Sequence, residues 1–597
     1  MRRFLPWGVL GVSLAISAGA ATPPAGDVEA RRKAFQSLLA EQWEYTLSHS
    51  PEFASILGDK RWNDKVSDFS QKAIDDDLAK TREFLGRFEA IDPTGFPDQE
   101  ALTRTLLVRA FKEELDNAHF KNWEMPVSQI GGIHLGAAQL VTLLPFDSVK
   151  DYDDYIARLK QLPKMFDDTA IQMRKGMADG LMPPRFLLEK VSVQCERIAE
   201  QKPEETPFAQ PLEKMPKSFS DSDRTRLRES MLSAIVHSVL PAYAKFAAFV
   251  KEEYAPRGRS EPGMWSLPDG AARYAAAVKT QTTTDLTPEQ IHQIGLEQVA
   301  LLEKQMLEIA RKLGYSDLKS FNASIAKDSK LRAHSREEIL DLYRKYIAQM
   351  KAELPKLFGR LPKADCIVMP VEAFREKEAA GAQYDQGTPD GKRPGHVMVN
   401  TSDPESRKTI SMESTAYHEG VPGHHLQIAI AQELEDLPPQ RQQAGYTAFM
   451  EGWALYSERL GKEVGFYQDP YNDYGRLQDE MLRAIRLVVD TGFHSKKWTR
   501  QQVVEFFHDH SAIDEVEVQS ETDRYISDPG QALAYKIGQL KILELRERSK
   551  KELGDRFDIR KFHDTVLDAG ALPLDVLSAR VDSWVASERA GGGAAAK

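Results

Sequence analysis

The amino-acid sequence predicts a mainly α protein, built as a large helical body with a small β element. Long segments after residue 21 space their apolar residues three and four positions apart, which is the period of an amphipathic helix. Strand patterns are scarce by comparison. The composition, with 41% hydrophobic and 28% charged residues, is typical of a globular protein. At 597 residues the chain is too long for one small core, so we expect two or three packed units.

The first twenty residues have the pattern of an export signal. Arg2 and Arg3 form a short positive region, and the stretch Phe4–Ile16 is apolar. Ala18–Ala20 (A-G-A) then supplies small residues where a signal peptidase cuts. No later stretch reaches the roughly 18 apolar residues that span a bilayer. We therefore expect a periplasmic or secreted protein of a bacterium, without an integral membrane segment once the signal is removed.

The remaining chain divides into two helical halves. Lys202–Ser220 carries four prolines and is expected to be an exposed loop, whereas Pro256–Gly270, rich in Pro and Gly, is the expected boundary. The predicted parts are a signal peptide (1–20), an N-terminal helical half (21–255), a C-terminal half with the chemical motif (256–590) and a disordered tail (591–597). The clearest helical patterns of the first half are Ala30–His49, Asp151–Met177 and Asp223–Tyr254.

The second half begins with a well-marked helix. Thr287 supplies a capping hydroxyl, Pro288 occupies the first helical position and Gln290 the third. This helix can run to Leu313 before Gly314 ends it. The two stretches with strand character are Ile367–Pro370 and His396–Asn400.

Charge and cysteine content exclude two classes of function. The chain has 79 Lys and Arg against 90 Asp and Glu, a net charge of −11, so its surface would repel nucleic acid and we expect no such partner. Its only cysteines are Cys195 and Cys366, which rules out a disulfide framework or a cysteine-based zinc cluster. A single bridge between the two stays open.

Residues 417–427, Y-H-E-G-V-P-G-H-H-L-Q, carry the most informative motif. They begin like H-E-x-x-H, in which two histidines on one helical turn bind zinc and the glutamate acts as base. The fourth residue after His418 is Pro422, however, and the next histidines are His424 and His425. In a regular helix a step of six residues rises about 9 Å, so His418 and His424 could not share a metal.

Pro422 offers a way to bring these histidines together. Its ring cannot donate to the carbonyl of residue 418 and pushes against it. With Gly420 and Gly423 beside it, the turn can bulge and draw its two ends together. Such a costly local feature needs a reason, and a bound metal provides one.

A third ligand is expected from the helical segment Tyr446–Glu458. Glu451 lies within its apolar pattern, where a buried carboxylate without a partner would be costly. A metal would satisfy it, and a salt bridge to an arginine is the alternative. Glu458 lies seven residues on, on the same face, as a candidate outer partner of the site. Two histidines and one carboxylate would leave a fourth zinc position for water.

Two segments resemble a bacterial family of uncharacterised proteins, DUF 885, which is grouped with zinc metallopeptidases. They are H-E-G-V-P-G-H-H-L-Q at residues 418–427 and F-M-E-G-W-A-L-Y-S-E at residues 449–458. The resemblance covers most of the chain and is strongest from about residue 260 to 580. The other matching stretches are Leu267–Tyr274, Thr282–Gly295, Asp390–Asn400 and Arg524–Leu540.

The resemblance implies a helical zincin-like metallopeptidase fold, similar to the gluzincins that include angiotensin-converting enzyme, thimet oligopeptidase and thermostable carboxypeptidases. Those proteins carry H-E-x-G-H, so Gly423-His424 corresponds to their Gly-His after a two-residue insertion. By that match His418, His424 and Glu451 hold one Zn²⁺ per chain and Glu419 is the general base. The insertion leaves His425 as an alternative to His424.

Further site residues are nominated from the resemblance and from chemistry together. A tyrosine hydroxyl or an imidazole can stabilise an oxyanion, and Tyr525 and His494 are the candidates. A cation can pair with the carboxylate of a peptide end, for which we nominate Arg524 or Lys536, with Tyr535 also placed among the substrate-binding residues. Each of these side chains has a purely structural alternative in a helical core. By analogy, the strand His396–Asn400 is an edge that holds substrate by strand addition.

The resulting hypothesis is an exported zinc metallopeptidase that acts on oligopeptides, with carboxypeptidase-like removal of C-terminal residues as one form. Zinc lowers the pKa of its water toward neutrality and Glu419 takes the proton during attack on a carbonyl. Two alternatives remain: a zinc hydrolase of a non-peptide amide or ester, and a non-catalytic periplasmic helical protein that binds metal or peptide. Glu419 favours catalysis, because a structural zinc site needs no adjacent base.

Overall fold

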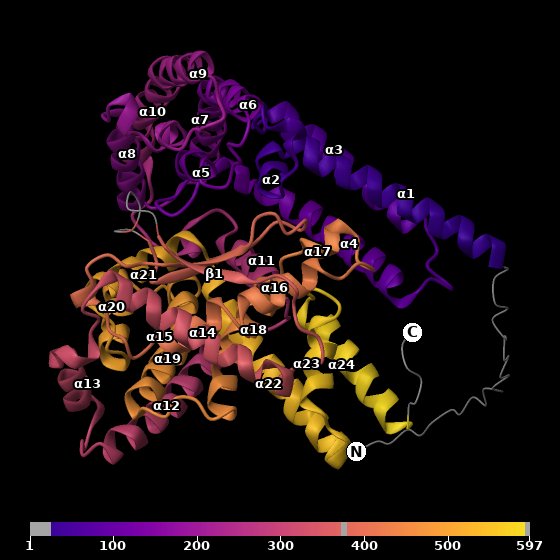
Figure 1. The fold of residues 1–597 in the computed structure, drawn as a ribbon, viewed down its shortest axis with the longest axis vertical. Coiled ribbons are helices and arrows are strands. Elements are labelled where there is room, and N and C mark those ends of the chain that lie inside the picture. The colour runs from indigo at the N-terminus through magenta and orange to yellow at the C-terminus, as the bar shows by residue number, and fades with distance from the viewer. Residues whose placement is uncertain (1–24, 372–375, 377–378, 592–597) are drawn as a thin grey trace, which may run out of the picture.

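A computed structural model of the chain describes residues 25–371, 376 and 379–591. The predicted signal peptide lies outside these residues, as do residues 592–597 of the predicted tail. Helices dominate the described chain (Figure 1), which confirms the prediction of a mainly α protein. The strands among the described residues form one three-stranded sheet.

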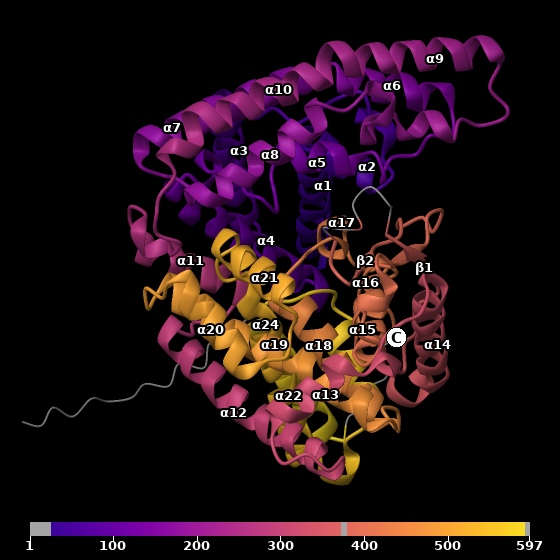
Figure 2. The same cartoon turned by 90° about the vertical axis from the view of Figure 1, so that its left-hand side faces the viewer.

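The N-terminal half forms an upper layer in Figures 1 and 2. Phe35, Phe84 and Phe88 pack into a small core between the long helices α1, α3 and α4. A larger core, which contains Tyr155 and Tyr243, lies among α6, α7, α8 and α10. The α-helices of this half are α1 (Ala25–His49), α2 (Pro51–Ile56), α3 (Gln71–Glu89), α4 (Asp98–Asn117), α5 (Ile133–Leu140), α6 (Val149–Leu159), α7 (Leu162–Asp179), α8 (Arg185–Ala199), α9 (Asp221–Ala234) and α10 (Leu240–Phe249).

The proline-rich segment Lys202–Ser220 is not the exposed loop that its sequence predicts. It forms two 3-10 helices, Pro203–Glu205 and Pro207–Glu213, and the side chain of Phe208 is fully buried in the larger core. Tyr152 donates a hydrogen bond to the carbonyl of Pro211 at 2.8 Å. Because proline needs no partner for a backbone N–H, a proline-rich segment can lie against a core where other loops cannot.

One described helix has the length and apolar composition to cross a membrane. It runs from Asp221 to Arg257 through α9 and α10, and its most apolar window has a mean hydropathy of 1.3. The sequence prediction concerned a stretch of about 18 apolar residues, and this helix has polar residues, among them His237 and Lys245, within its apolar part. Half of that window is buried inside the protein, where α10 packs against α7 and α8. Burial of this kind is typical of a helix in a protein core.

The C-terminal half forms the lower layer in Figures 1 and 2. Its first long helix begins as predicted, because Thr287 and Gln290 form a reciprocal capping box, and Gly314 follows its end with a φ of +91°. The α-helices of this half are α11 (Gly270–Thr282), α12 (Pro288–Lys312), α13 (Leu318–Lys327), α14 (Arg336–Leu357), α15 (Met412–Glu419), α16 (His424–Gln432), α17 (Pro439–Gln442), α18 (Thr447–Glu463), α19 (Pro470–His494), α20 (Arg500–His510), α21 (Glu515–Ser527), α22 (Ala534–Leu553), α23 (Ile559–Leu567) and α24 (Leu574–Arg589).

The small sheet contains β1 (Cys366–Pro370), β2 (Ala382–Asp385) and β3 (Gly395–Val399) in the order β1-β3-β2. Both predicted strands are present within one residue of their expected bounds, and β2 was missed. β3 pairs parallel with β1 and antiparallel with β2. The expected edge role of His396–Asn400 is therefore wrong, because a central strand has no free backbone groups for an added strand.

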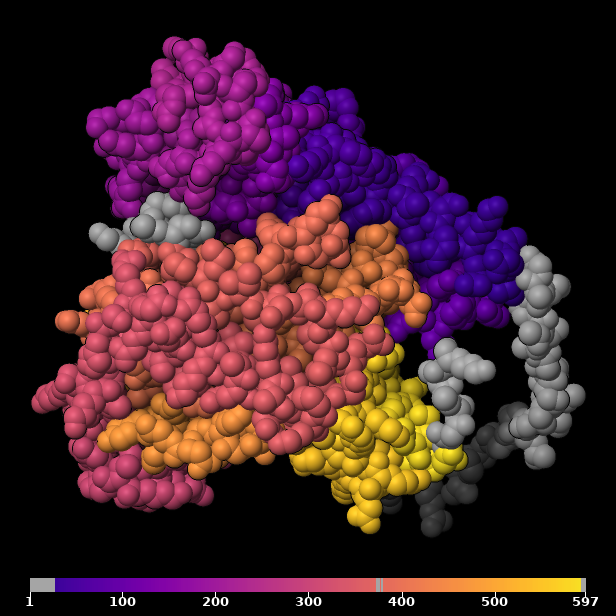
Figure 3. All heavy atoms as spheres, viewed as in Figure 1, coloured from indigo at the N-terminus to yellow at the C-terminus, as the bar shows by residue number. Residues whose placement is uncertain are grey.

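The two halves meet along a broad front, and Figure 3 shows the N-terminal half lying over the C-terminal half. The larger N-terminal core ends at Ala255, and the main core of the C-terminal half runs from Met264 onward but also includes Leu106 of α4. Gln129 Nε2 donates to the carbonyl of Asp523 across the front at 3.0 Å. Cys195 and Cys366 are both free thiols, so the bridge that the sequence left open is not formed.

Helices α18 and α22 cross at two glycines. A Cβ atom on Gly538 would lie 1.8 Å from the carbonyl oxygen of Ala448, and one on Gly452 would lie 2.5 Å from Gly538. Gly452 directly follows Glu451, so this close approach fixes the part of α18 that carries the predicted carboxylate ligand.

We expect Gly538→Ala to lower the free energy of unfolding by about 1–3 kcal/mol, because the added methyl group forces the two helices apart. Gly86→Ala is the matched control. Nothing lies within 4 Å of a Cβ at Gly86 in α3, so that change should be neutral or should stabilise the protein by up to about 1 kcal/mol. Denaturant unfolding of both variants checks the prediction, and equal effects would contradict it.

Candidate metal centre

The histidine-rich segment is a broken helix. α15 ends at Glu419 and α16 begins at His424, so the predicted distortion is a complete break rather than a bulge. The N–H of Gly423 folds back to donate to the carbonyl of Tyr417 at 2.9 Å. A Cβ on Gly423 would lie 1.9 Å from the carbonyl oxygen of His418, so a side chain cannot be accommodated there. Trp453 Nε1 holds the turn by donating to the carbonyl of Pro422 at 2.8 Å.

The break brings His418, His424 and Glu451 together. The two imidazole rings lie 4.9 Å apart between centroids, at 87° to each other. Glu451 Oε2, from α18, lies 3.5 Å from His418 Nε2 and 3.3 Å from His424 Nε2. One ligand atom from each residue lies within 4.8 Å of the other two. The three side chains that the sequence nominates as ligands therefore converge on one point.

The donor atoms fit a zinc ion. His418 is 3% exposed, and Glu451 Oε2 is buried with no hydrogen-bond partner among the described residues. Leaving a buried acceptor without a partner costs about 1–3 kcal/mol, and more for a charged group. Two imidazole nitrogens and one carboxylate oxygen form a ligand set of catalytic zinc, with a position left for water.

The site also favours a positive charge. Burial lowers the pKa of His418, but the nearby carboxylates of Glu451 and Glu458 outweigh burial and raise that pKa to about 10. For Glu451, burial raises the pKa, but the nearby imidazoles of His424 and His418 hold it well below its usual value. The surrounding carboxylates thus create a negative potential at the point where the three side chains meet.

Glu458 orients the imidazole ring of His418 through Nδ1, the ring nitrogen that does not face Glu451. Its Oε1 lies 2.8 Å from His418 Nδ1, and because a carboxylate only accepts, Nδ1 is the donor. In the neutral ring this arrangement leaves the lone pair on Nε2, so a metal that displaces the Nε2 proton would find that nitrogen facing Glu451. The structure thus places Glu458 where the sequence analysis expected an outer partner of the site.

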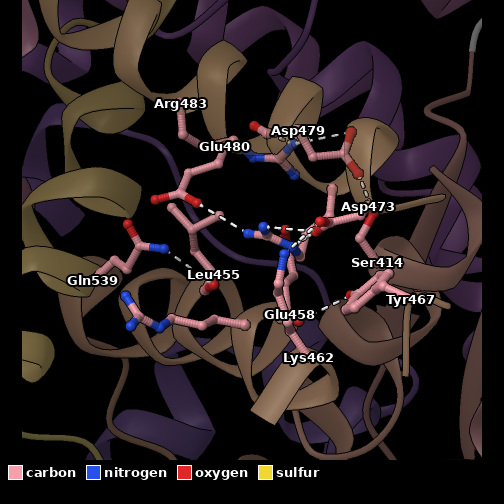
Figure 4. A network of polar contacts seen from close by, with 12 residues as sticks. Ser414, Leu455, Glu458, Lys462, Tyr467, Asp473, Asp479, Glu480, Arg483 and Gln539 are labelled. Carbon is pink, nitrogen blue, oxygen red and sulfur yellow. Dashed lines mark hydrogen bonds and ion pairs between the residues drawn. The ribbon is translucent and has the colours of Figure 1, made fainter. Parts of the chain in front are cut away.

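A buried polar network supports this orienting carboxylate (Figure 4). Tyr467 donates to the backbone carbonyl of Glu458 at 2.9 Å. Ser414, one turn before His418, donates to Asp479 of α19. Burial raises the pKa of Asp479 to about 7. The network connects α15, α18 and α19, so the ligand helices are held by side chains as well as by packing.

We expect Glu458→Gln to weaken zinc affinity by roughly 10–100-fold, because the amide cannot place the same negative charge behind His418. Competition with a chelator of known affinity measures the change. The matched control is Glu463→Gln, further along α18, whose carboxylate pairs with Arg546 at 2.6 Å and touches none of the three ligands. An equal loss of affinity in both variants would contradict the prediction.

Glu419 ends α15 directly after His418. Its side chain is half-buried, and its carboxylate has no hydrogen bond or ion pair within the described chain. A carboxylate that is not held by other protein groups is available to substrate and water. It directly follows His418, a candidate ligand, as the role of base that the sequence analysis gave it requires.

His425 points away from the three converging side chains. Its Nδ1 lies 3.0 Å from the hydroxyl of Tyr384 on β2, and its Nε2 donates to the carbonyl of Ala364 at 3.2 Å. Between the two alternatives left open by the sequence, the structure places His424 beside His418 and Glu451. It places His425 beside Tyr384 and Ala364.

One nominated substrate-binding residue, Tyr535, lies next to the three-residue cluster, and a second, Arg524, contacts Tyr535. The ring of Tyr535 stacks beside His418, with centroids 6.5 Å apart and planes at 19°. Arg524 Nη2 donates to the Tyr535 hydroxyl at 3.4 Å and to Gln531 Oε1 at 2.7 Å. The side chain of Arg524 is 27% exposed, so its guanidinium retains access to solvent.

Sequence reasoning missed Arg486 of α19. Its guanidinium carbon lies 4.7 Å from the centroid of the Tyr535 ring, and it pairs with Glu521 at 2.8 Å. The signal was present, because an arginine within the apolar run Ile485–Val489 needs a buried partner.

His494 and Tyr525 do not have the free donors that their nominated roles require. His494 Nδ1 accepts from the N–H of Met264 at 3.1 Å, and its Nε2 donates to the carbonyl of Tyr525 at 2.9 Å. Burial lowers the pKa of His494 to about 3. The Tyr525 hydroxyl donates to Glu521 and accepts from Arg486 Nε. We therefore withdraw the oxyanion role of both residues, because their polar atoms already form hydrogen bonds within the protein core.

Lys536 is likewise occupied. Its Nζ lies 2.6 Å from Glu480 Oε1 and 2.8 Å from Gln539 Oε1, and the residue is 1% exposed. A buried ammonium that already has an anionic partner cannot also bind the carboxylate of a substrate without losing that pair. Between the two nominated cations, Arg524 is the one that remains accessible.

A polar cavity of about 520 Å³ lies elsewhere, between α4, α11 and α24. Arg109, Lys279 and Asp575 line it, and none of the nominated site residues does. Its lining includes the carboxylates of Glu113, Asp285 and Asp575 but no histidine or cysteine. The cluster of His418, His424 and Glu451 combines two imidazoles with a carboxylate, which is a ligand set of catalytic zinc. We therefore place the candidate site at the cluster.

Comparison with known proteins gives a family and a fold. The family model described as "Bacterial protein of unknown function (DUF885)" matches residues 51–581. A crystal structure from Colwellia psychrerythraea is 30% identical, with a TM-score of 0.89 over 93% of this chain and 99% of that one. A structure from Shewanella oneidensis is 17% identical, with a TM-score of 0.70 over 91% and 99%. Both are described as a putative lipoprotein. No curated protein matches the sequence.

Proposed function

The chain belongs to the DUF885 family of bacterial proteins, and we propose that it is an exported zinc-dependent peptidase that acts on oligopeptides. The observation that carries the proposal is the convergence of His418, His424 and Glu451 within 4.8 Å, with Glu419 adjacent to the first of them. A purely structural zinc site would need no free carboxylate beside its ligands.

His418, His424 and Glu451 would hold the metal. A zinc ion there supplies a Lewis acid and lowers the pKa of a water molecule toward neutrality. Glu419 accepts a proton from the attacking water and passes it to the amine that leaves when the C–N bond breaks. The hydroxyl of Tyr535, whose ring stacks beside His418, is the donor that we assign to the developing oxyanion in place of Tyr525.

Arg524 is the residue that we assign to the C-terminal carboxylate of the peptide. It is partly exposed and donates to the Tyr535 hydroxyl, so it lies on the same side of the cluster as the assigned oxyanion donor. A guanidinium binds a carboxylate through two parallel hydrogen bonds, which favours peptides with a free end. This placement supports a carboxypeptidase-like form of the activity.

The proposal that the fold is zincin-like rests on the order of the residues around the break between α15 and α16. Gly423-His424 follows a two-residue insertion relative to H-E-x-G-H, and the broken helix supports an alignment that places His424 beside His418. Export is supported by the pattern of residues 1–20 and by the description of both structural relatives as lipoproteins.

Metal analysis combined with digestion of a peptide library tests the proposal. We expect one zinc per chain, cleavage of short peptides, loss of cleavage after chelation and recovery when zinc is returned. Zinc binding without cleavage of any peptide would favour a binding protein. Cleavage restricted to small esters or other amides would favour a different zinc hydrolase.

A further inference from the structure

A second group of metal-ligating side chains lies beyond the candidate zinc site. Asp365 and Cys366, at the start of β1, and His425, in the first turn of α16, each offer one ligand atom within 4.8 Å of the other two. Figure 2 shows β1, β2 and α16 lying together in this region. None of these three residues takes part in the proposed hydrolysis.

We propose that Asp365, Cys366 and His425 form a second cation site, selective for zinc-like metals, that ties β1 to the start of α16. A thiolate, an imidazole and a carboxylate are the ligands of zinc and of the related ion cadmium, whereas calcium and magnesium require a set of oxygens. The proposal does not rest on the peptidase activity, because it uses different ligands.

The backbone of this site is held in place without a metal. Both carboxylate oxygens of Glu433, at the end of α16, accept hydrogen bonds from the N–H of Lys363 at 2.8 and 2.9 Å, and one accepts from Ala364 at 2.9 Å. The segment that leads into Asp365 is therefore fixed to the same helix that carries His425. A preorganised site of this kind loses less entropy when it binds an ion.

The imidazole of His425 is also oriented for binding. The residue is 1% exposed, and the Tyr384 hydroxyl lies 3.0 Å from its Nδ1. A hydroxyl both donates and accepts, so Tyr384 can hold the ring in either tautomer while Nε2 exchanges the Ala364 carbonyl for a metal. Metal-ligating histidines usually have such a partner on their other nitrogen.

Cys366 is the group whose function is otherwise unexplained. It is a free cysteine, half-buried at the first position of β1. Asp365 is exposed and pairs with Lys351, so the site opens toward solvent and an ion can enter. The Lys351 ammonium competes with a cation for the Asp365 carboxylate, and we therefore expect this site to bind more weakly than the first.

Titration of the full chain with Cd²⁺ tests the proposal, because a cadmium–thiolate bond adds an ultraviolet charge-transfer band that the cysteine-free first site cannot produce. We expect the band to saturate at one Cd²⁺ per chain in the wild type and in Glu451→Gln. Cys366→Ser should abolish it, and His425→Gln should weaken cadmium affinity at least about tenfold. Lys351→Met should strengthen it about fivefold.

Cys195→Ser is the control, because Cys195 is fully buried in the N-terminal core and its loss should leave the band unchanged. A band that survives His425→Gln with unchanged affinity would mean that the thiol binds alone, and would overturn the proposal. So would the absence of a band in the wild type. Circular dichroism without metal verifies that each variant is folded.

Discussion

Replacing Glu419 by glutamine is expected to lower kcat for peptide hydrolysis by about a thousandfold, while zinc content stays at one ion per chain. Glutamine has nearly the same shape but cannot accept a proton from water at neutral pH. The side chain is half-buried and is not held by the described protein groups, so the change should leave the ligands His418 and His424 where they are.

Steady-state kinetics on a peptide found in the library digest, together with metal analysis, measure this effect. The matched control is Glu435→Gln, an exposed carboxylate in the loop after α16, which should retain wild-type kcat. A decrease below tenfold for Glu419→Gln would assign the base to another residue. A loss of zinc in the same variant would make Glu419 a ligand instead.

The metal cluster could be predicted because its determinants are local. His418 and His424 lie on either side of a Gly-Val-Pro-Gly turn, and both glycines and the proline indicate that a regular helix cannot continue. Glu451 could be recognised because a carboxylate in an apolar helix needs a compensating partner. The sequence could not specify that the distortion is a full break in the helix. The indole of Trp453, which lies in α18, stabilises this break by donating a hydrogen bond to the carbonyl of Pro422.

The errors concern side chains whose partners lie far away along the chain. Met264 binds His494 across 230 residues, and Glu480 binds Lys536 across 56. No local pattern indicates such pairs. Tyr525 and Tyr535 lie on successive helices, and only the packing of α19 against both decides which of the two rings lies beside His418.

The prediction of the strands was limited in the same way, because pairing between distant segments is not visible in a local pattern. β1 has two adjacent β-branched residues and β3 has valines at alternate positions, and both strands were predicted. β2, Ala382–Asp385, has four half-buried residues and no β-branched residue, and it was missed. The edge role expected for β3 rests on analogy, and β2 is the strand that covers the second side of β3. Tyr384 of β2, which holds His425, could not be connected to that histidine from the sequence.

His424→Ala is expected to abolish stoichiometric zinc binding and, with it, peptide cleavage. Its Nε2 is one of only two imidazole nitrogens facing Glu451 Oε2, so its loss should weaken affinity by more than the roughly 10–100-fold expected for an outer partner such as Glu458. Equilibrium dialysis against zinc measures the affinity, and a spectroscopic check of helicity shows whether the variant is folded.

The neighbouring variant His425→Ala provides the contrast, because its ring contacts Tyr384 and Ala364 instead of the cluster. It should keep the zinc at the first site with only a partial loss of affinity, and it should lose the cadmium–thiolate band of the second. His424→Ala should keep that band. The two variants would thus show that His424 belongs to the first site and His425 to the second. If His425→Ala lost the zinc and His424→Ala lost the band, the two assignments would have to be exchanged.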